Sequence, residues 1–156
     1  MKVKAMRLVE IGKPLIPMQV ELPNPKGYEV LVRVKAVGVC RSDFHFRSGY
    51  IGKFNILTDL NIKLPLTLGH EISGVIEDFG DKVPSIFKKG DKVVIYPWQG
   101  DGVCKYCRIG EEHLCDNFRH LGINTDGGYS EYILVPNYKY LYRFDRVDFT
   151  QIAPIA

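Results

Sequence analysis

The chain has 156 residues, of which 46% are hydrophobic and 25% charged, and its 21 basic and 18 acidic side chains give a formal charge of +3. These values match an ordinary soluble domain with one core and exclude a disordered or fibrous chain. The basic residues are spread along the chain, which argues against a nucleic-acid partner. No apolar run reaches the roughly 18 residues of a membrane span, and the charged start does not resemble a signal peptide. We therefore expect a cytoplasmic protein with no membrane partner.

The first predicted strand covers residues 16–22, where apolar side chains alternate and predict one half-buried face. Its apolar members are Ile16, Met18, Val20 and Leu22. A β-branched, mostly apolar run over residues 30–39 then predicts a core strand that ends at Cys40.

Three more strands are predicted, over residues 72–79, 92–96 and 129–135, each bounded by glycine-containing turns. Helical patterns are limited to a short turn over 42–47 and a start signal at Asp148 or Thr150. Short strands between turns predict a mainly β fold, a barrel or a sandwich. The long connections over 50–65 and 97–128 lack periodicity, so we expect them to be functional or braced by a metal.

Three of the four cysteines crowd into one of these connections. Cys104 and Cys107 form a Cys-x-x-Cys pair, and Cys115 follows eight residues later. Zinc takes four ligands in a tetrahedron, and such a pair lets two sulfur atoms reach one ion from a tight turn. Asp101 is the preferred fourth ligand, because His113 lies only two residues from Cys115 and two side chains that close in sequence are poorly placed to bind the same tetrahedral ion. The pattern predicts a closed, structural zinc site.

Two other interpretations of this cysteine segment stay open, a redox Cys-x-x-Cys pair and three buried free thiols. A reducing compartment, expected in the absence of a signal peptide, favours metal binding or catalysis over disulfides. The segment has few apolar residues, so we expect the metal to supply much of its order.

A second group of candidate ligands lies upstream. Cys40 follows one predicted strand, and His70 and Glu71 come directly before another. Thiolate, imidazole and carboxylate all suit zinc, while Ser42 and His45 offer a hydroxyl and an imidazole for proton transfer. Taken singly, a cysteine at a strand end is more often a core residue and a lone histidine more often structural.

Together these motifs resemble the zinc-containing alcohol dehydrogenases of the medium-chain family, most of all its archaeal thermophilic members. The motifs are Cys40-Arg-Ser-Asp-Phe-His45, the cysteine segment, and Gly69-His70-Glu71 followed by Gly74, Gly80 and Val83. The resemblance covers nearly the whole chain. It implies that residues 1–156 form the family's catalytic domain, a mainly β, GroES-like, partly open barrel with a structural zinc lobe over 99–116.

The resemblance also implies roles for single residues. Cys40 and His70 are expected to bind a catalytic zinc ion, with Glu71 approaching the metal or exchanging onto it. Ser42 is expected to take the alcohol proton and His45 to pass it towards solvent. The substrate is then a small alcohol or carbonyl compound.

In this family the hydride goes to NAD or NADP on a Rossmann domain that begins with Gly-x-Gly-x-x-Gly. That turn is missing here, since Gly100-Asp-Gly102 lacks its third glycine and Gly127-Gly128 precedes a predicted strand. Arg41 is expected to meet the cofactor's pyrophosphate. Trp98 and Leu121 are candidates for the substrate pocket.

We accordingly expect this stretch to lack the cofactor half and the third catalytic ligand, a cysteine that the family places just beyond Ala156. The chain alone is expected not to turn over, and its exposed interdomain surface is expected to promote self-association. Many relatives carry a fourth cysteine where this chain has Asp101, a harder ligand that predicts weaker binding.

Two other functions remain open at this point. The first is a zinc-binding assembly module of GroES-like fold without catalysis, although such a module has no need of Ser42, His45 and Glu71. The second is a redox or electron-transfer protein that uses Cys104 and Cys107.

Overall fold

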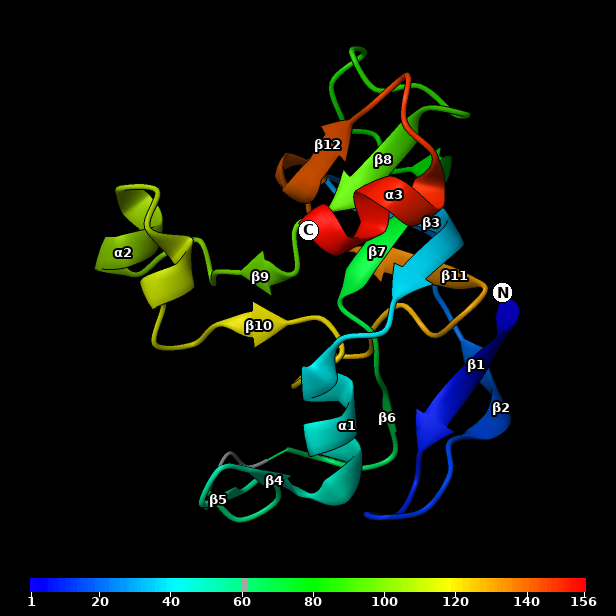
Figure 1. The fold of residues 1–156 in the computed structure, drawn as a ribbon. Helices are drawn as coiled ribbons and strands as arrows, with labels where there is room; N and C mark the ends of the chain where they lie inside the picture. Colours follow the sequence, from blue (N-terminus) through cyan, green and yellow to red (C-terminus); the bar gives the residue numbers. More distant parts are fainter. Residues whose placement is uncertain (60–61) are drawn as a thin grey trace.

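The structure, a computed structural model, describes residues 1–59 and 62–156, and is mainly β (Figure 1). Residues 60 and 61, part of the expected connection over 50–65, lie outside the described part. The strands are β1 (Lys2–Leu8), β2 (Ile16–Glu21), β3 (Val30–Gly38), β4 (Tyr50–Ile51), β5 (Phe54–Asn55), β6 (Leu66–Thr67), β7 (Glu71–Phe79), β8 (Lys92–Ile95), β9 (Trp98–Gln99), β10 (Arg119–His120), β11 (Tyr132–Val135) and β12 (Leu141–Arg143). The helices are α1 (Arg41–Ser48), α2 (Lys105–Arg108) and α3 (Phe149–Ile152), with the 3-10 turns η1 (Glu112–Leu114), η2 (Tyr138–Tyr140) and η3 (Ala153–Ile155).

The largest sheet is antiparallel, with the strand order β11-β3-β7-β8-β12. All five stretches predicted as strands contain a strand. Four of these strands, β3, β7, β8 and β11, belong to this sheet. The pairing of β3 with β7 runs from Val30 opposite Phe79 to Gly38 opposite Glu71. This register brings the residues just after β3 beside those just before β7.

The core of the large sheet consists of buried aliphatic side chains and one tyrosine. Its members are Val30, Val32, Ile72, Ile76, Val93, Ile95, Leu121, Ile133, Val135, Tyr140 and Leu141. A second cluster lies around α1, where Phe46 packs with Leu8, Ile56, Ile62, Leu66 and Leu68. Each buried side chain of this size contributes about 1.5–3 kcal/mol relative to exposure, so the α1 region is held by its own core.

A smaller sheet has the order β2-β1-β6. Strand β1 was not predicted, although its burial alternates, because lysines and an arginine separate its few apolar residues. The expected burial of β2 is wrong, since Ile16 is 44% and Met18 37% exposed. Among residues 1–59 and 62–156, strand β2 pairs with β1 alone, and such an edge strand leaves its apolar face exposed.

The cysteine segment projects from the rest of the domain. Strands β9 and β10 form a two-stranded ribbon, and α2 and η1 lie at its far end, away from the large sheet (Figure 1). Helix α3, which follows the expected start at Asp148, packs on β3 and β7, where Ser73 Oγ donates to the Phe149 carbonyl at 2.8 Å. No helix of the described residues is long and apolar enough to cross a membrane.

Candidate metal centres

The first centre joins Cys40, His70 and Glu71. One ligand atom from each lies within 4.8 Å of the other two, and all three side chains are half-buried. Cys40 follows β3 directly and Glu71 begins β7, so the sheet register described above brings them together. Gly38 lies opposite Glu71 without a side chain, and a Cβ atom there would collide with the Glu71 carboxylate. The glycine therefore provides the space that the carboxylate occupies.

Asp43 ties the segments of this centre together. The residue is only 5% exposed, and its Oδ2 accepts from the Cys40 N–H at 2.9 Å and from the Tyr129 hydroxyl at 3.0 Å. Its Oδ1 accepts from the Gly69 N–H at 3.1 Å and lies 3.8 Å from His70 Nδ1. Burial, followed by the Asp43 carboxylate, raises the pKa of Tyr129, which keeps that hydroxyl a donor. A buried carboxylate with three donors fixes both strand ends.

His70 has one partnered and one unpartnered ring nitrogen. Nε2 lies 3.2 Å from Ser42 Oγ, whereas Nδ1 is buried without a hydrogen bond among the described residues. Imidazole, thiolate and carboxylate are all zinc ligands, and a zinc-bound histidine directs its second nitrogen to a carboxylate, as Nδ1 does towards Asp43 at 3.8 Å. The residues present therefore fit a zinc ion.

His120 adds a second buried imidazole that the sequence analysis did not single out. It is 3% exposed, and its ring centroid lies 4.3 Å from that of Trp98 and 5.6 Å from that of His70. Burial lowers its pKa to about 4, and the Leu121 carbonyl lies 2.9 Å from Nδ1, so the neutral ring carries its proton there. Trp98 and His120 thus form one wall beside His70.

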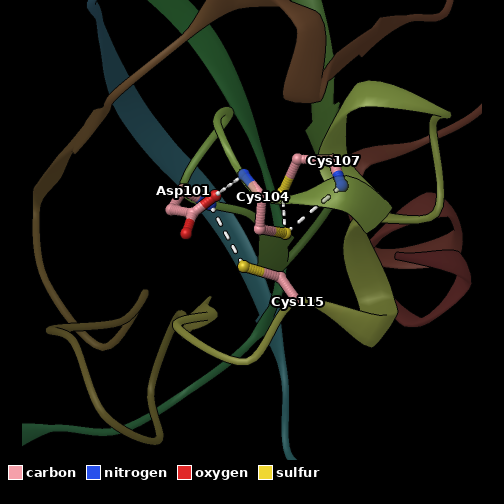
Figure 2. A group of neighbouring side chains, drawn as sticks. All are labelled: Asp101, Cys104, Cys107 and Cys115. Carbon is pink, nitrogen blue, oxygen red and sulfur yellow. Dashed lines mark hydrogen bonds between the residues drawn. The ribbon is translucent and has the colours of Figure 1, made fainter.

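The second centre lies in the projecting lobe. Asp101, Cys104, Cys107 and Cys115 each bring one ligand atom within 4.8 Å of the others (Figure 2). The sulfur atoms of Cys104 and Cys107 are 3.5 Å apart, close to the about 3.8 Å that two thiolates adopt on one tetrahedral zinc at about 2.3 Å each. The four groups fit a closed zinc site.

Backbone N–H groups hold this set in place. The Val103 and Cys104 N–H groups donate to Asp101 Oδ1 at 2.9 and 3.0 Å. These two hydrogen bonds, of which the one from Cys104 has the larger effect, lower the pKa of Asp101 to about 2. The Cys107 N–H lowers the pKa of the Cys104 thiol, whereas desolvation raises that of Cys107 to about 12. One thiolate and one carboxylate are therefore favoured by the backbone alone, while Cys107 needs a cation to ionise.

A model of the alcohol dehydrogenase GroES-like domain matches residues 26–145. The chain belongs to this family. It is 56% identical over 153 residues to an NAD-dependent alcohol dehydrogenase of Saccharolobus solfataricus, a match that covers 98% of this chain and 44% of the relative. The chain thus spans less than half the length of the curated relatives it matches.

Solved structures agree with this family assignment. The crystal structure of D-arabinose dehydrogenase from Sulfolobus solfataricus superimposes with a TM-score of 0.84 at 36% identity, over 99% of this chain and 44% of that one. A cobalt- and zinc-bound thermostable alcohol dehydrogenase from Pyrobaculum aerophilum gives a TM-score of 0.77 at 30% identity, over 99% and 45%. The mainly β, GroES-like fold expected from the sequence is therefore confirmed.

Within this GroES-like domain, the other candidate residues lie at different distances from the centres. Arg41 is exposed at the start of α1, and His45 is half-buried one turn further along. Leu121 packs into the core of the large sheet, while Trp98 lies against His120. His113 is exposed and lies 3.4 Å from Glu111, outside the group that contains Asp101.

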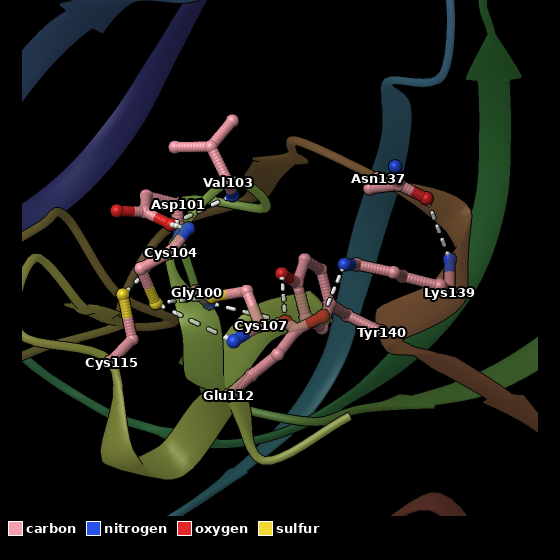
Figure 3. A network of polar contacts seen from close by, with 10 residues as sticks. All are labelled: Gly100, Asp101, Val103, Cys104, Cys107, Glu112, Cys115, Asn137, Lys139 and Tyr140. Carbon is pink, nitrogen blue, oxygen red and sulfur yellow. Dashed lines mark hydrogen bonds and ion pairs between the residues drawn. The ribbon is translucent and has the colours of Figure 1, made fainter. Parts of the chain in front are cut away.

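Glu112 connects the lobe of the alcohol dehydrogenase domain to its barrel, a role that the sequence did not suggest (Figure 3). Its carboxylate accepts from the Gly100 N–H at 3.2 Å and the Tyr140 hydroxyl at 2.5 Å, and it pairs with the Lys139 ammonium. Desolvation acts to raise its pKa, but Lys139 and Tyr140 outweigh this and hold the pKa below its ordinary value. This side chain therefore helps to anchor the lobe to the rest of the domain.

Proposed function

We propose that this chain is the zinc-binding, substrate-activating domain of an NAD(P)-dependent alcohol dehydrogenase, with residues 1–156 forming that domain. The observation that carries the proposal is the convergence of Cys40, His70 and Glu71 within 4.8 Å, with Ser42 Oγ 3.2 Å from His70. A purely structural site has no use for a hydroxyl at this position. The substrate class is a small alcohol or carbonyl compound.

In this proposal Cys40 and His70 hold the catalytic ion, and Glu71 lies beside it. Zn²⁺ bound there supplies Lewis acidity that lowers the pKa of an alcohol hydroxyl. Ser42 Oγ accepts the alcohol proton as its own hydroxyl proton passes to His45, three residues further along α1, and His45 releases a proton to solvent. The wall formed by Trp98 and His120 excludes water from the reacting carbon, and Leu121 supports this wall from behind.

We assign a structural role to the ion of the lobe, residues 99–116. All four candidate ligands, Asp101, Cys104, Cys107 and Cys115, come from one continuous segment. Together they fill the four positions of a tetrahedral ion and leave none for a substrate. A closed set of four protein ligands is typical of structural zinc. The ion orders the lobe, and the reaction does not pass through it.

The hydride acceptor in this proposal is NAD or NADP, held by a Rossmann domain outside residues 1–156, with Arg41 facing its pyrophosphate. Exposed Val39 and Phe44, at 66% and 60%, lie beside the first centre and supply apolar surface for contact with that domain or for self-association. The four free cysteines agree with a reducing, cytoplasmic location.

Elemental analysis of zinc in protein purified without added metal tests the proposal. We expect two classes of zinc, one lost in Cys104→Ser and the other, more weakly held, lost in Cys40→Ser. Loss of both classes in Cys104→Ser alone, or no effect of Cys40→Ser, contradicts the two-centre assignment.

An activity assay tests the catalytic half of the proposal separately. The 156 residues alone are expected to show no oxidation of ethanol or cyclohexanol with NAD or NADP, whereas a fusion to a family Rossmann domain is expected to be active. Ser42→Ala should reduce that activity by about 10²–10⁴-fold, the usual range for a proton-transfer group. Full activity of Ser42→Ala in the fusion contradicts the assigned role.

A further inference from the structure

The β9–β10 ribbon lies between the two metal centres. Its outer end continues into the lobe, since β9 ends two residues before Asp101 and β10 begins four residues after Cys115 (Figure 1). Its inner end carries Trp98 opposite His120, and the ring centroid of His120 lies 5.6 Å from that of His70. One short ribbon therefore connects the lobe ligands to the wall beside the first centre.

The two strands of this ribbon are held unequally by the rest of the domain. Asn124 fixes β10, because its Oδ1 accepts from the His120 N–H at 2.7 Å and its Nδ2 donates to the Phe118 carbonyl at 3.0 Å. On β9, by contrast, the amide Nε2 of Gln99 is buried without a hydrogen-bond partner among the described residues. The position of β9, and with it that of Trp98, therefore depends on the pairing with β10.

This pairing is too short to be stable alone. It joins two residue pairs, and in the part of the chain that the structure describes the ribbon has no third strand. One further hydrogen bond, from the Leu121 N–H to the Pro97 carbonyl at 3.1 Å, closes its inner end. Isolated two-stranded ribbons are marginal at best in water, because their few hydrogen bonds barely offset the backbone entropy lost on ordering. The outer end therefore needs another link between the strands.

Asp101 and Cys115 supply this link. The Asp101 N–H donates to Cys115 Sγ at 3.4 Å across the outer end of the ribbon (Figure 2). Both residues also belong to the ligand set of the lobe. An ion bound to both closes the loop of residues 101–115 and, as a disulfide would, removes the freedom of the two strands to separate.

We propose that the lobe ion positions Trp98 against His120 and so keeps the wall beside the first centre closed. That this wall faces a substrate rests on the proposed function, whereas the positioning itself does not. Asp101 and Cys115 are positioning residues in this scheme, because they act through the ribbon and touch no substrate. The ligands of the first centre are brought together by the pairing of β3 with β7, so loss of the lobe ion leaves them in place.

The single tryptophan of the chain reports on this wall directly. The emission of Trp98 is measured in the Cys40→Ser variant of the 156-residue chain, first without metal and then with zinc, which in this variant fills the lobe alone. We expect zinc to shift the emission to shorter wavelength and to reduce quenching by acrylamide. Hydrogen exchange of the most protected backbone amide of residues 98–100 should slow by about 100-fold, the effect expected of a cross-link around a loop of this length.

Cys104→Ser is the matched control, because it keeps the first centre and loses the lobe ion. Zinc should bind to this variant while Trp98 keeps the emission and the quenching of the metal-free chain. Asp116→Asn in the Cys40→Ser background, an exposed change in the lobe, should respond to zinc as its parent does. Zinc bound in the lobe without any change at Trp98, or the same change at Trp98 in Cys104→Ser, overturns the proposal.

A fusion to a family Rossmann domain separates this proposal from the proposed function. There Cys104→Ser should raise the KM for the alcohol more than it lowers kcat, because the wall is loosened while the first centre keeps its ion. An unchanged KM overturns the proposal that the lobe ion closes the wall. An inactive wild-type fusion contradicts the proposed function alone, since the response of Trp98 to zinc requires no reaction.

Discussion

The two metal centres are built in opposite ways. The lobe centre takes all four donors from residues 101–115, and backbone N–H groups of the same turn hold them. The first centre takes its donors from positions 40, 70 and 71, which only the pairing of β3 with β7 brings together. A local site can be recognised from spacing but depends on its ion for order. A site that is assembled by strand pairing cannot be recognised from the spacing of its ligands in the sequence, and its ligands are already close together before any ion binds.

The largest expected effect is on the lobe. Cys104→Ser should leave residues 101–116 without order, because few apolar contacts replace a structural ion whose binding free energy in small zinc domains is about 10–16 kcal/mol. Limited proteolysis should then cut within this segment while the large sheet stays intact. Cys40→Ser is the matched control and should leave the lobe resistant. A lobe that resists proteolysis in Cys104→Ser would show that it does not depend on its ion for order, and the proposed difference between the two centres would be wrong.

His120→Phe should change the pH dependence of stability. The folded-state pKa of His120 is lowered to about 4, so wild-type stability falls as the pH drops from about 6.5, the unfolded value, towards 4. The span corresponds to about 3 kcal/mol at most, and the phenylalanine variant should lack it. Urea unfolding of both proteins across this pH range measures the difference. Parallel curves would mean that His120 protonates equally in both states.

Asp43→Asn should weaken the first centre without touching the lobe. The amide loses the charge that holds the Cys40 N–H, the Gly69 N–H and the Tyr129 hydroxyl, and loss of such a supporting group lowers metal affinity by about 10–100-fold. Competition with a coloured chelator measures this. Asp116→Asn, an exposed change in the lobe, serves as the control. Equal weakening of both zinc classes would show that the centres are coupled.

Glu112→Gln should have the smallest effect, a loss of about 1–2 kcal/mol in the stability of the lobe, since one charged acceptor is replaced by a neutral one. The folded-state pKa of Glu112 is lowered, so its contribution is present above about pH 4.3 and is lost as the pH falls through the folded value. Hydrogen exchange of the lobe amides at pH 7 and pH 4 measures this. A gap between variant and wild type that widens with acid would contradict the sign.

The fold was predictable wherever a strand is apolar enough to be buried on its own. The runs over 30–39 and 72–79 correspond to β3 and β7. Strand β1 escaped notice because its charged residues interrupt the pattern, and β9 and β10 because two-residue strands arise only from their mutual pairing. Local sequence carries no record of such pairing.

The candidate site was predictable to a different degree in its two halves. The ligand spacing of Cys104 and Cys107 pointed to metal directly, whereas Cys40 and His70 needed the resemblance to a family to be placed together. Asp43 lies inside the quoted motif. Its position, three residues after Cys40, the N-cap of α1, was the signal, because a carboxylate there can accept from the N-cap N–H. Glu112 gave no such signal, because its partners lie 12 to 28 residues away.

A substitution at Gly38 would change the number of ligands at the first centre. The carboxylate of Glu71 occupies the room that a side chain at this position would fill. Enlarging residue 38 would evict that oxygen donor while leaving the sulfur and nitrogen donors in place. The preference of the site between harder and softer metals could then be tuned from a residue that binds none of them.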